Sequence, residues 1–305
     1  QQSKLPLYSS VDGVITTPYL VMSDDKVIMA KDNFVRVTSH SSDATINYLV
    51  ASEVVRPSEL KDQDVKDVAD FVKANKASER IAWKGVTIDA YASPEGEVKM
   101  NDNLADKRAA TAKRWIQGVL NANKIDSAKA DSFYTLNPRG EDWAGFKAAV
   151  QASTFADKDL VLRVLEMYPD VDKREQEIKN MSATYKELAE DILPKLRRSE
   201  IKLNYDVNGY SDEELSSLSK TNPDTMTVEE LLRAATLTSD LNEQLRIYKE
   251  AERLYPQDYR TANDVGYVLF EQGKSADAEA EFQKANSIMD NTISTTPLGV
   301  TARQK

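Results

Sequence analysis

The sequence predicts an α+β protein with two folded parts, and three observations support this fold class. The chain has 305 residues, 41% of them hydrophobic, which is enough for about two domains with cores of their own. It contains only 10 Gly and 10 Pro, fewer than the turns of an all-β protein normally require. Strand-like and helix-like patterns alternate up to residue 206, whereas only helix-like patterns follow residue 225.

Residues 1–45 are expected to form a short N-terminal β segment. Two apolar runs, 19–22 and 27–30, flank a Ser-Asp-Asp-Lys turn and predict a β-hairpin. Residues 34–38 alternate in polarity and predict a third strand. His40 follows in a serine-rich stretch and is interpreted as a solvated loop residue. Because it is the only histidine and the chain has no Cys, His-rich metal sites and zinc fingers are excluded.

Residues 46–206 are expected to form one domain with the order β-α-β-α-β-β and a helical insertion at about 157–193. The predicted strands are 45–50, 81–92, 133–136 and 200–205, and the predicted helices are 61–77, 101–123, 157–169 and 178–196. Apolar and polar residues alternate along 81–92, so one face of that strand is expected to be buried. Trp143 and Phe146 are expected to pack against the sheet.

A polar linker with a single helical turn is predicted over 207–224, helical repeats over 225–290 and a flexible, irregular tail over 291–305. Residues 225–256 and 259–290 align at a period of 34 residues, the length of a tetratricopeptide repeat. The pairs that recur at this period include Tyr248 with Phe282 and Ala251 with Ala285, while Gly266, Gly273, Ala278 and Pro256 stand where that repeat has small residues and a proline. The segment therefore resembles the tetratricopeptide repeat family. The resemblance implies docking of a protein partner, here an envelope protein.

The most informative motif begins where the strand 81–92 ends. The run Ile-Asp-Ala-Tyr-Ala-Ser-Pro-Glu-Gly over 88–96 leads to Asn-x-x-Leu-Ala-x-x-Arg-Ala over 101–109. Arg-Gly-Glu at 139–141 and Leu-Arg-Arg-Ser-Glu-Ile at 196–201 follow in order. Together these four landmarks resemble the OmpA C-terminal-like family of peptidoglycan-associated domains, over about residues 46–206. The resemblance implies a protein of the Gram-negative cell envelope.

The resemblance also implies a binding site for the diamino acid of a peptidoglycan stem. In that family an Asp in the turn receives the ammonium group, and the helix Arg holds the carboxylate by a forked, charge-assisted pair. By position, Arg108 is the carboxylate clamp and Asn101 a polar wall of the site. Arg197 and Arg198 supply positive charge nearby.

The turn half of this site departs from the family, because Ser93 stands where the family has Asp. A serine hydroxyl provides no countercharge. Glu95, two residues on, is the first candidate to replace it, and Asp89, on the same strand face as Ser93, is the second. Three structural alternatives stay open. Arg108 pairs with Asp89 or Glu95 instead of a ligand, Asn101 caps the helix, and Arg197 with Arg198 forms a solvated entrance to the last strand.

Charge and motifs exclude several function classes. A net charge of −10 disfavours a nucleic-acid binder, and no apolar run is long enough to span a membrane. The chain has no GxSxG, HExxH, phosphate-loop or GxGxxG motif, so we expect no enzymatic activity and no cofactor or metal. The carboxylate pairs of a hydrolase are the weakest alternative; the candidates are Glu95 with Asp102, and Glu141 with Asp142.

Two functions follow from these expectations. The first is a cell-envelope protein that binds peptidoglycan through the OmpA-like module and a protein through the repeats. The second is a scaffold or assembly subunit whose OmpA-like module no longer binds the wall. Gln1-Gln2, without an initiator Met, is what a secreted chain shows after its signal peptide is removed, so we expect a periplasmic or outer-membrane-associated protein.

Overall fold

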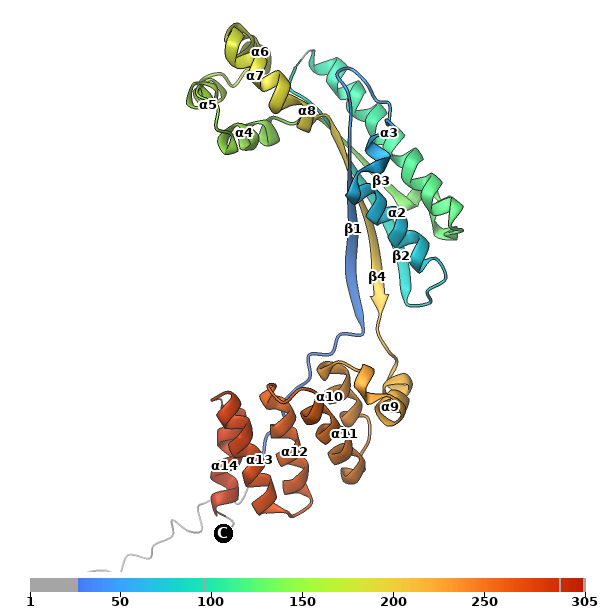
Figure 1. The fold of residues 1–305 in the computed structure, drawn as a ribbon, viewed down its shortest axis with the longest axis vertical. Coiled ribbons are helices and arrows are strands. Elements are labelled where there is room, and N and C mark those ends of the chain that lie inside the picture. Colours follow the sequence, from blue (N-terminus) through green and yellow to red (C-terminus); the bar gives the residue numbers. More distant parts are fainter. Residues whose placement is uncertain (1–26, 96, 291, 304–305) are drawn as a thin grey trace, which may run out of the picture. The chain divides into compact units, whose positions relative to one another are not determined.

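The computed structural model describes residues 27–95, 97–290 and 292–303, which belong to two compact units (Figure 1). The first unit comprises the described residues of 36–209, and the second comprises those of 210–303 together with residues 27–35. Each unit has a hydrophobic core of its own. We name them the sheet unit and the helical unit.

The sheet unit is built on four strands in a mixed sheet, which confirms the α+β class. The strands are β1 (Val37–Asn47), β2 (Ile81–Ala92), β3 (Tyr134–Glu141) and β4 (Arg198–Asn208). Their order in the sheet is β1-β4-β2-β3. Strand β4 runs antiparallel to both of its neighbours, whereas β2 and β3 are parallel.

Two helices, α2 (Gln63–Asn75) and α3 (Val98–Ala122), cover one face of this sheet (Figure 1). The alternation along β2 is as predicted: Val86 and Ile88 are buried under the helices. The core beneath the helices is formed by every second residue of the strands and by one stripe of each helix, including Val68, Ile116 and Leu203. This packing fixes the middle and the C-terminal part of α3 against the sheet.

Strand β1 corrects two predictions for the N-terminal part. Residues 34–38 and 45–50 were expected to be separate strands with His40 in a loop between them, but β1 is continuous from Val37 to Asn47. His40 pairs with Tyr205 of β4, and the two rings stack with centroids 5.7 Å apart. The expectation failed because β1 lies at the edge of the sheet, where polar side chains remain exposed within a strand.

Five helices lie between β3 and β4, together at one end of the sheet (Figure 1). They are α4 (Trp143–Ala152), α5 (Lys158–Met167), α6 (Val171–Asn180), α7 (Ser182–Asp191) and α8 (Leu193–Leu196). The single helix predicted over 178–196 was wrong, because the chain breaks at Met181 and Ile192, ahead of a proline in α8. The predicted contact of Trp143 and Phe146 with the sheet was also wrong, since both belong to the core of these helices.

The helical unit consists of α9 (Asp212–Thr221), α10 (Val228–Thr236), α11 (Leu241–Leu254), α12 (Tyr259–Glu271), α13 (Ser275–Ile288) and α14 (Thr292–Arg303). The predicted linker over 207–224 therefore contains a ten-residue helix, which begins with a capping box formed by Ser211 and Glu214. The predicted irregular tail over 291–305 contains α14. Both were missed because their helices lack a clear apolar stripe in the sequence.

The small residues of the repeat pattern lie where helices approach closely. A Cβ atom on Gly266 of α12 would be 2.7 Å from Cε1 of Phe282 on α13, so a larger residue does not fit beside the buried ring. Gly273, in the turn between these helices, has φ of 77°, which favours glycine. Residues 27–35 form neither helix nor strand, so the hairpin predicted for 27–30 was wrong; its other arm, 19–22, lies outside the described residues.

Within the described residues, every helix is too short or too polar to cross a membrane.

Candidate functional site

The sheet unit holds a cavity of about 310 Å³ at the start of α3, and four of the six predicted site residues line it: Ser93, Glu95, Asn101 and Arg108. Arg197 joins them from the loop before β4, through hydrogen bonds to Ser93 and Glu95. Arg198 lies apart from the group.

A glycine at the end of β3 brings Glu141 to the start of α3. Gly140 has φ of 65°, and a Cβ atom there would be 2.5 Å from a carboxylate oxygen of Asp102 on α3. A glycine therefore lets the end of β3 approach the first turns of α3. As a result Glu141, the last residue of β3, accepts a hydrogen bond from Asn101 Nδ2 at 2.8 Å.

Arg108 is the most deeply buried of the predicted residues, with 1% of its surface exposed. Its Nε–H donates to the main-chain oxygen of Ser52 at 3.0 Å. Its Nη1 and Nη2 donate to the main-chain oxygens of Tyr91 (2.8 Å) and Leu49 (3.2 Å). Burial lowers the pKa of Arg108 to about 10, so the guanidinium stays charged at neutral pH while it holds three segments together.

The carboxylates expected as internal partners of Arg108 have other partners. Asp89 accepts from Arg139 at 2.7 Å, and Glu95 is bound by Arg197. The alternative that Arg108 pairs with Asp89 or Glu95 is therefore wrong: Arg108 is held by its own chain, but through main-chain carbonyls. The sequence gives no signal for them, because every residue carries a carbonyl group.

Glu95 forms a polar triad with two buried residues, Ser93 and Arg197. Arg197 Nη2 lies 2.6 Å from Glu95 Oε1, and its Nε donates to the same oxygen at 2.9 Å. The Ser93 hydroxyl donates to Glu95 Oε1 at 2.7 Å. The interpretation of Arg197 as a solvated residue is wrong, since only 6% of it is exposed. The guanidinium of Arg197 therefore neutralises Glu95, the residue that was expected to take the place of the Asp found in the OmpA-like family.

Asn101 is a buried connector and does not cap its helix. Helix α3 begins at Val98, and its N-cap position is occupied by Glu97. The Asn101 Nδ2 group donates to the main-chain oxygens of Ser93 (3.4 Å) and Glu95 (3.2 Å), in addition to Glu141. It therefore ties the turn after β2 to the end of β3.

Arg198 lies on the face of the sheet opposite to the cavity, where it has partners within the protein. It pairs with Asp142 at 2.8 Å and with Glu200 at 2.7 Å, and its guanidinium lies 4.4 Å from the centre of the Tyr91 ring. Asp142 also caps α4 by accepting from the N–H of Gly145. Arg198 thus fastens the helical insertion to β4.

What remains for a ligand is the rim of the cavity. Its other charged side chains are Glu53, Glu97 and Lys107, and its apolar lining includes Val50, Met100 and Leu104. A rim of both signs suits a small zwitterion. Among the described residues no group of His, Asp and Glu side chains is placed to hold a metal ion.

Replacing Glu95 by Gln is expected to destabilise the sheet unit by about 1–3 kcal/mol, because Arg197 then stays buried without a countercharge. Urea unfolding followed by tryptophan fluorescence measures this, since Trp83, Trp115 and Trp143 all belong to the sheet unit. Glu97→Gln, at the exposed N-cap, is the matched control and should change stability by less than about 0.5 kcal/mol. Equal stability of both variants would show that the triad is dispensable.

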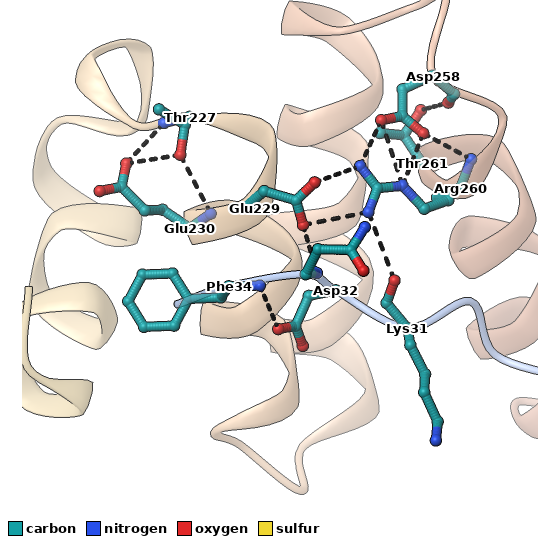
Figure 2. Close-up of polar contacts among 10 residues, drawn as sticks. Lys31, Asp32, Phe34, Thr227, Glu229, Glu230, Asp258, Arg260 and Thr261 are labelled. Atoms are coloured by element: carbon teal, nitrogen blue, oxygen red, sulfur yellow. Dashed lines mark hydrogen bonds and ion pairs between the residues drawn. The ribbon is translucent and has the colours of Figure 1, made fainter. Parts of the chain in front are cut away.

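The helical unit presents a second candidate site, which is occupied by residues 27–34 of the same chain. Figure 2 shows this extended segment passing the first turns of α10 and α12. The N–H of Asn33 donates to Glu229 Oε2 at 2.5 Å. Arg260 pairs with Glu229 (2.6 Å) and Asp258 (2.7 Å), and its Nη1 donates to the main-chain oxygen of Lys31 at 3.4 Å (Figure 2).

Two fully buried residues of α12 continue this contact. Asn263 Nδ2 donates to the main-chain oxygen of Ile28 at 2.9 Å, and the N–H of Ala30 donates to Asp264 Oδ1 at 2.7 Å. In the described part of the chain, Asp264 Oδ2 has no hydrogen-bond partner. Asn263 and Asp264 are therefore placed to bind the main chain of an extended segment, and the sequence analysis missed both.

Asp264 should make the helical unit less stable as pH rises. Burial raises the pKa of Asp264 from 3.8 to about 7, against the opposing effects of Asn263, Ala30 and Arg260. Between these pH values the folded state keeps a proton that the unfolded state has released, so stability falls from about pH 4 to about pH 7, by up to roughly 4 kcal/mol. Urea unfolding followed by circular dichroism at pH 5 and pH 8 measures the fall. Asp264→Asn should reduce the fall without abolishing it, because burial and the neighbouring Glu252 also raise the pKa of Glu281, in the same unit, to about 7; an equal fall in the variant would contradict the assignment.

No protein-family model matches this chain, and no curated protein matches its sequence.

Proposed function

We propose that this chain is a non-enzymatic scaffold of the Gram-negative cell envelope, periplasmic or associated with the outer membrane, that acts through protein–protein contacts. The four ordered landmarks and the order β1-α2-β2-α3-β3, five helices, then β4 support an OmpA-like sheet unit. The recurrence of Tyr248 as Phe282 and of Ala251 as Ala285 at 34 residues, with the close approach of Gly266 to Phe282, supports tetratricopeptide-like hairpins in the helical unit.

One observation carries the choice of a scaffold over a wall binder: the guanidinium of Arg108 donates three hydrogen bonds to main-chain carbonyls of its own unit. To hold a ligand carboxylate by a forked pair, the guanidinium would have to turn away from buried carbonyls and leave them unpaired. Glu95, the replacement for the missing Asp, is already neutralised by Arg197. Both halves of the expected clamp are thus engaged within the protein.

Binding of a peptidoglycan stem is the second candidate, and the cavity favours it. Its volume of about 310 Å³ is at the lower end of the range of small-molecule sites. In this version Glu53 and Glu97 receive the ammonium group of the diamino acid, and Lys107 receives the carboxylate. Arg108 then supports the cavity wall from behind.

At least one carboxylate of each pair considered for hydrolysis is engaged in structural contacts, which supports the non-enzymatic proposal. Glu141 accepts from Asn101 and from the indole N–H of Trp143, and Asp142 caps α4. Glu95 is bound by Arg197. Each of these carboxylates would have to give up its structural contacts before it could act on a substrate.

Co-sedimentation with purified peptidoglycan sacculi separates the two candidates. The scaffold proposal predicts that the wild-type chain is retained no better than a non-binding protein, and that crosslinking in the envelope captures a protein partner. Saturable retention that is lost in Lys107→Glu, but kept in the matched control Lys73→Glu on α2, would establish the second candidate and overturn the first. Both lysines are exposed, so neither variant should unfold the unit.

A further inference from the structure

The segment 27–34 is bound to the helical unit chiefly through its main chain. Side chains of α10 and α12 receive or donate hydrogen bonds at the backbone of four of its residues: Ile28, Ala30, Lys31 and Asn33. The segment has no helix or strand of its own. Its bound form therefore depends on the helical unit, and its departure would break no secondary structure.

The side chains of the segment add a pattern to this backbone contact. Val27, Met29 and Phe34 pack against the core of the helical unit, and Ala30 is 3% exposed. Met29 also accepts from the Tyr248 hydroxyl, at 3.3 Å. The side chain of Lys31, by contrast, is exposed. The segment therefore has apolar residues at positions 27 and 29, a small residue at 30 and an aromatic residue at 34, whereas position 28 is not restricted.

The receiving groups are held in place by the helices themselves. Arg260 is fixed by the carboxylates of Asp258 and Glu229, and Asn263 donates to its neighbour Asp264 at 3.0 Å. Side chains held in this way need little rearrangement to bind another extended segment. A binding site of this kind is preorganised. Main-chain hydrogen bonds supply affinity in such sites, and pockets for alternate side chains supply specificity.

We propose that the face formed by Glu229 on α10, Tyr248 on α11 and Arg260–Asp264 on α12 is an extended-peptide-binding site, which residues 27–34 occupy as a resident ligand. A partner protein docks there by supplying an extended segment with the same pattern, and it displaces the resident one. The proposal deepens the scaffold function and rests on it for its biological purpose. The binding itself depends only on contacts within the helical unit.

The resident segment sets the affinity for a partner. Because it is part of the same chain, its effective concentration at the site is high, and a competing peptide binds only to the fraction of molecules whose site is vacant. Weakening the resident segment must therefore strengthen the binding of an added peptide. This inverse relation distinguishes an exchangeable site from a fixed structural contact.

Fluorescence anisotropy with the full chain tests the exchange, using a labelled synthetic peptide with the sequence of residues 27–35. In the chain variant Ala30→Pro the resident segment loses the N–H that Asp264 accepts, and the proline ring does not fit at a buried alanine. We expect this variant to bind the peptide at least tenfold more tightly than the wild-type chain does. Adding Asp264→Ala should weaken peptide binding at least tenfold again.

Matched peptides complete the test. The peptide carrying Ala30→Pro should bind at least tenfold more weakly, whereas Lys31→Ala, which removes only an exposed side chain, should bind within twofold of the original. The proposal would be overturned if the wild-type and Ala30→Pro chains bound the original peptide equally well. It would also be overturned if the original peptide and its Ala30→Pro version bound the same chain equally well. If the Ala30→Pro chain fails to fold by circular dichroism, Phe34→Ser in the chain serves instead, and a folded variant that binds no peptide overturns the proposal.

The affinity measured for the peptide also serves to identify the occupant, by comparison with the self-association of the wild-type chain. This comparison does not depend on the scaffold function. If the wild-type chain dimerises with the affinity of the peptide, the occupant is a second copy of the chain and the claim of a different partner is overturned. Retention on sacculi is measured separately. Peptide exchange can therefore be observed even if the chain is retained on sacculi and the scaffold proposal fails. Conversely, the chain can fail to bind sacculi and also fail to exchange the peptide, which overturns only the peptide-binding proposal.

Discussion

Replacing Arg108 by alanine is expected to lower the free energy of unfolding of the sheet unit by about 3–5 kcal/mol. The change leaves the carbonyls of Leu49, Ser52 and Tyr91 without their donors, at about 1 kcal/mol or more for each, and it removes the packing of a fully buried side chain. Urea unfolding followed by tryptophan fluorescence reports on this unit alone. A value in this range is a large fraction of the stability of an ordinary domain.

Two further variants define the origin of this loss. Lys107→Ala, at the neighbouring exposed position of α3, should change stability by less than about 0.5 kcal/mol. Arg108→Lys keeps the charge but cannot reach three carbonyls in the fixed fork geometry of a guanidinium, so it should retain only part of the stability. If Arg108→Ala is as stable as the wild type, Arg108 is free for a ligand and the scaffold proposal loses its main support.

Replacing Phe282 by alanine is expected to destabilise the helical unit by about 3–5 kcal/mol, because it removes a fully buried ring between α12 and α13. Gly266→Ala should cost about 1–3 kcal/mol despite the better helix propensity of alanine, since the new methyl group meets that ring. Circular dichroism at the helical minimum during urea unfolding measures both losses, once the transition of the sheet unit, which also contains helices, has been identified by tryptophan fluorescence.

The double variant tests whether these two residues fit together as the repeat pattern requires. Once Phe282 is alanine, the methyl group at position 266 no longer meets the ring, so the double variant should lose less stability than the sum of the single variants. Additive losses would mean that the close approach of Gly266 to the ring is not what selects glycine. The similarity to tetratricopeptide repeats would then rest on spacing alone.

The sequence predicted the fold where a hydrophobic period was strong. Strand β2 and helix α3 were located to within a few residues, because their apolar residues repeat at intervals of two and of three to four. Helix α9 was missed because its buried residues are Leu215 and the polar Ser219, so no apolar stripe marks it in the sequence. Strand β1 was divided into two strands because its middle, 39–43, is polar and exposed at a sheet edge.

The site was predicted in its members but not in its contacts. The spacing of the motif predicted that Ser93, Glu95, Asn101 and Arg108 belong to one site, and all four line one cavity. The partners of Arg108 are carbonyl groups, and carbonyl positions depend on tertiary packing, which leaves no mark on residue type. The contact of residues 27–34 with the helical unit was not predicted either, since it joins segments more than 190 residues apart.

The most direct measurement of the central claim, that the guanidinium of Arg108 is bound within the protein, is the NMR signal of its Nε–H during titration with a peptidoglycan stem peptide. The account predicts a slowly exchanging proton whose chemical shift stays constant up to saturating peptide. A shift that follows a binding curve, together with faster exchange with solvent, would contradict it and would place the side chain on the ligand.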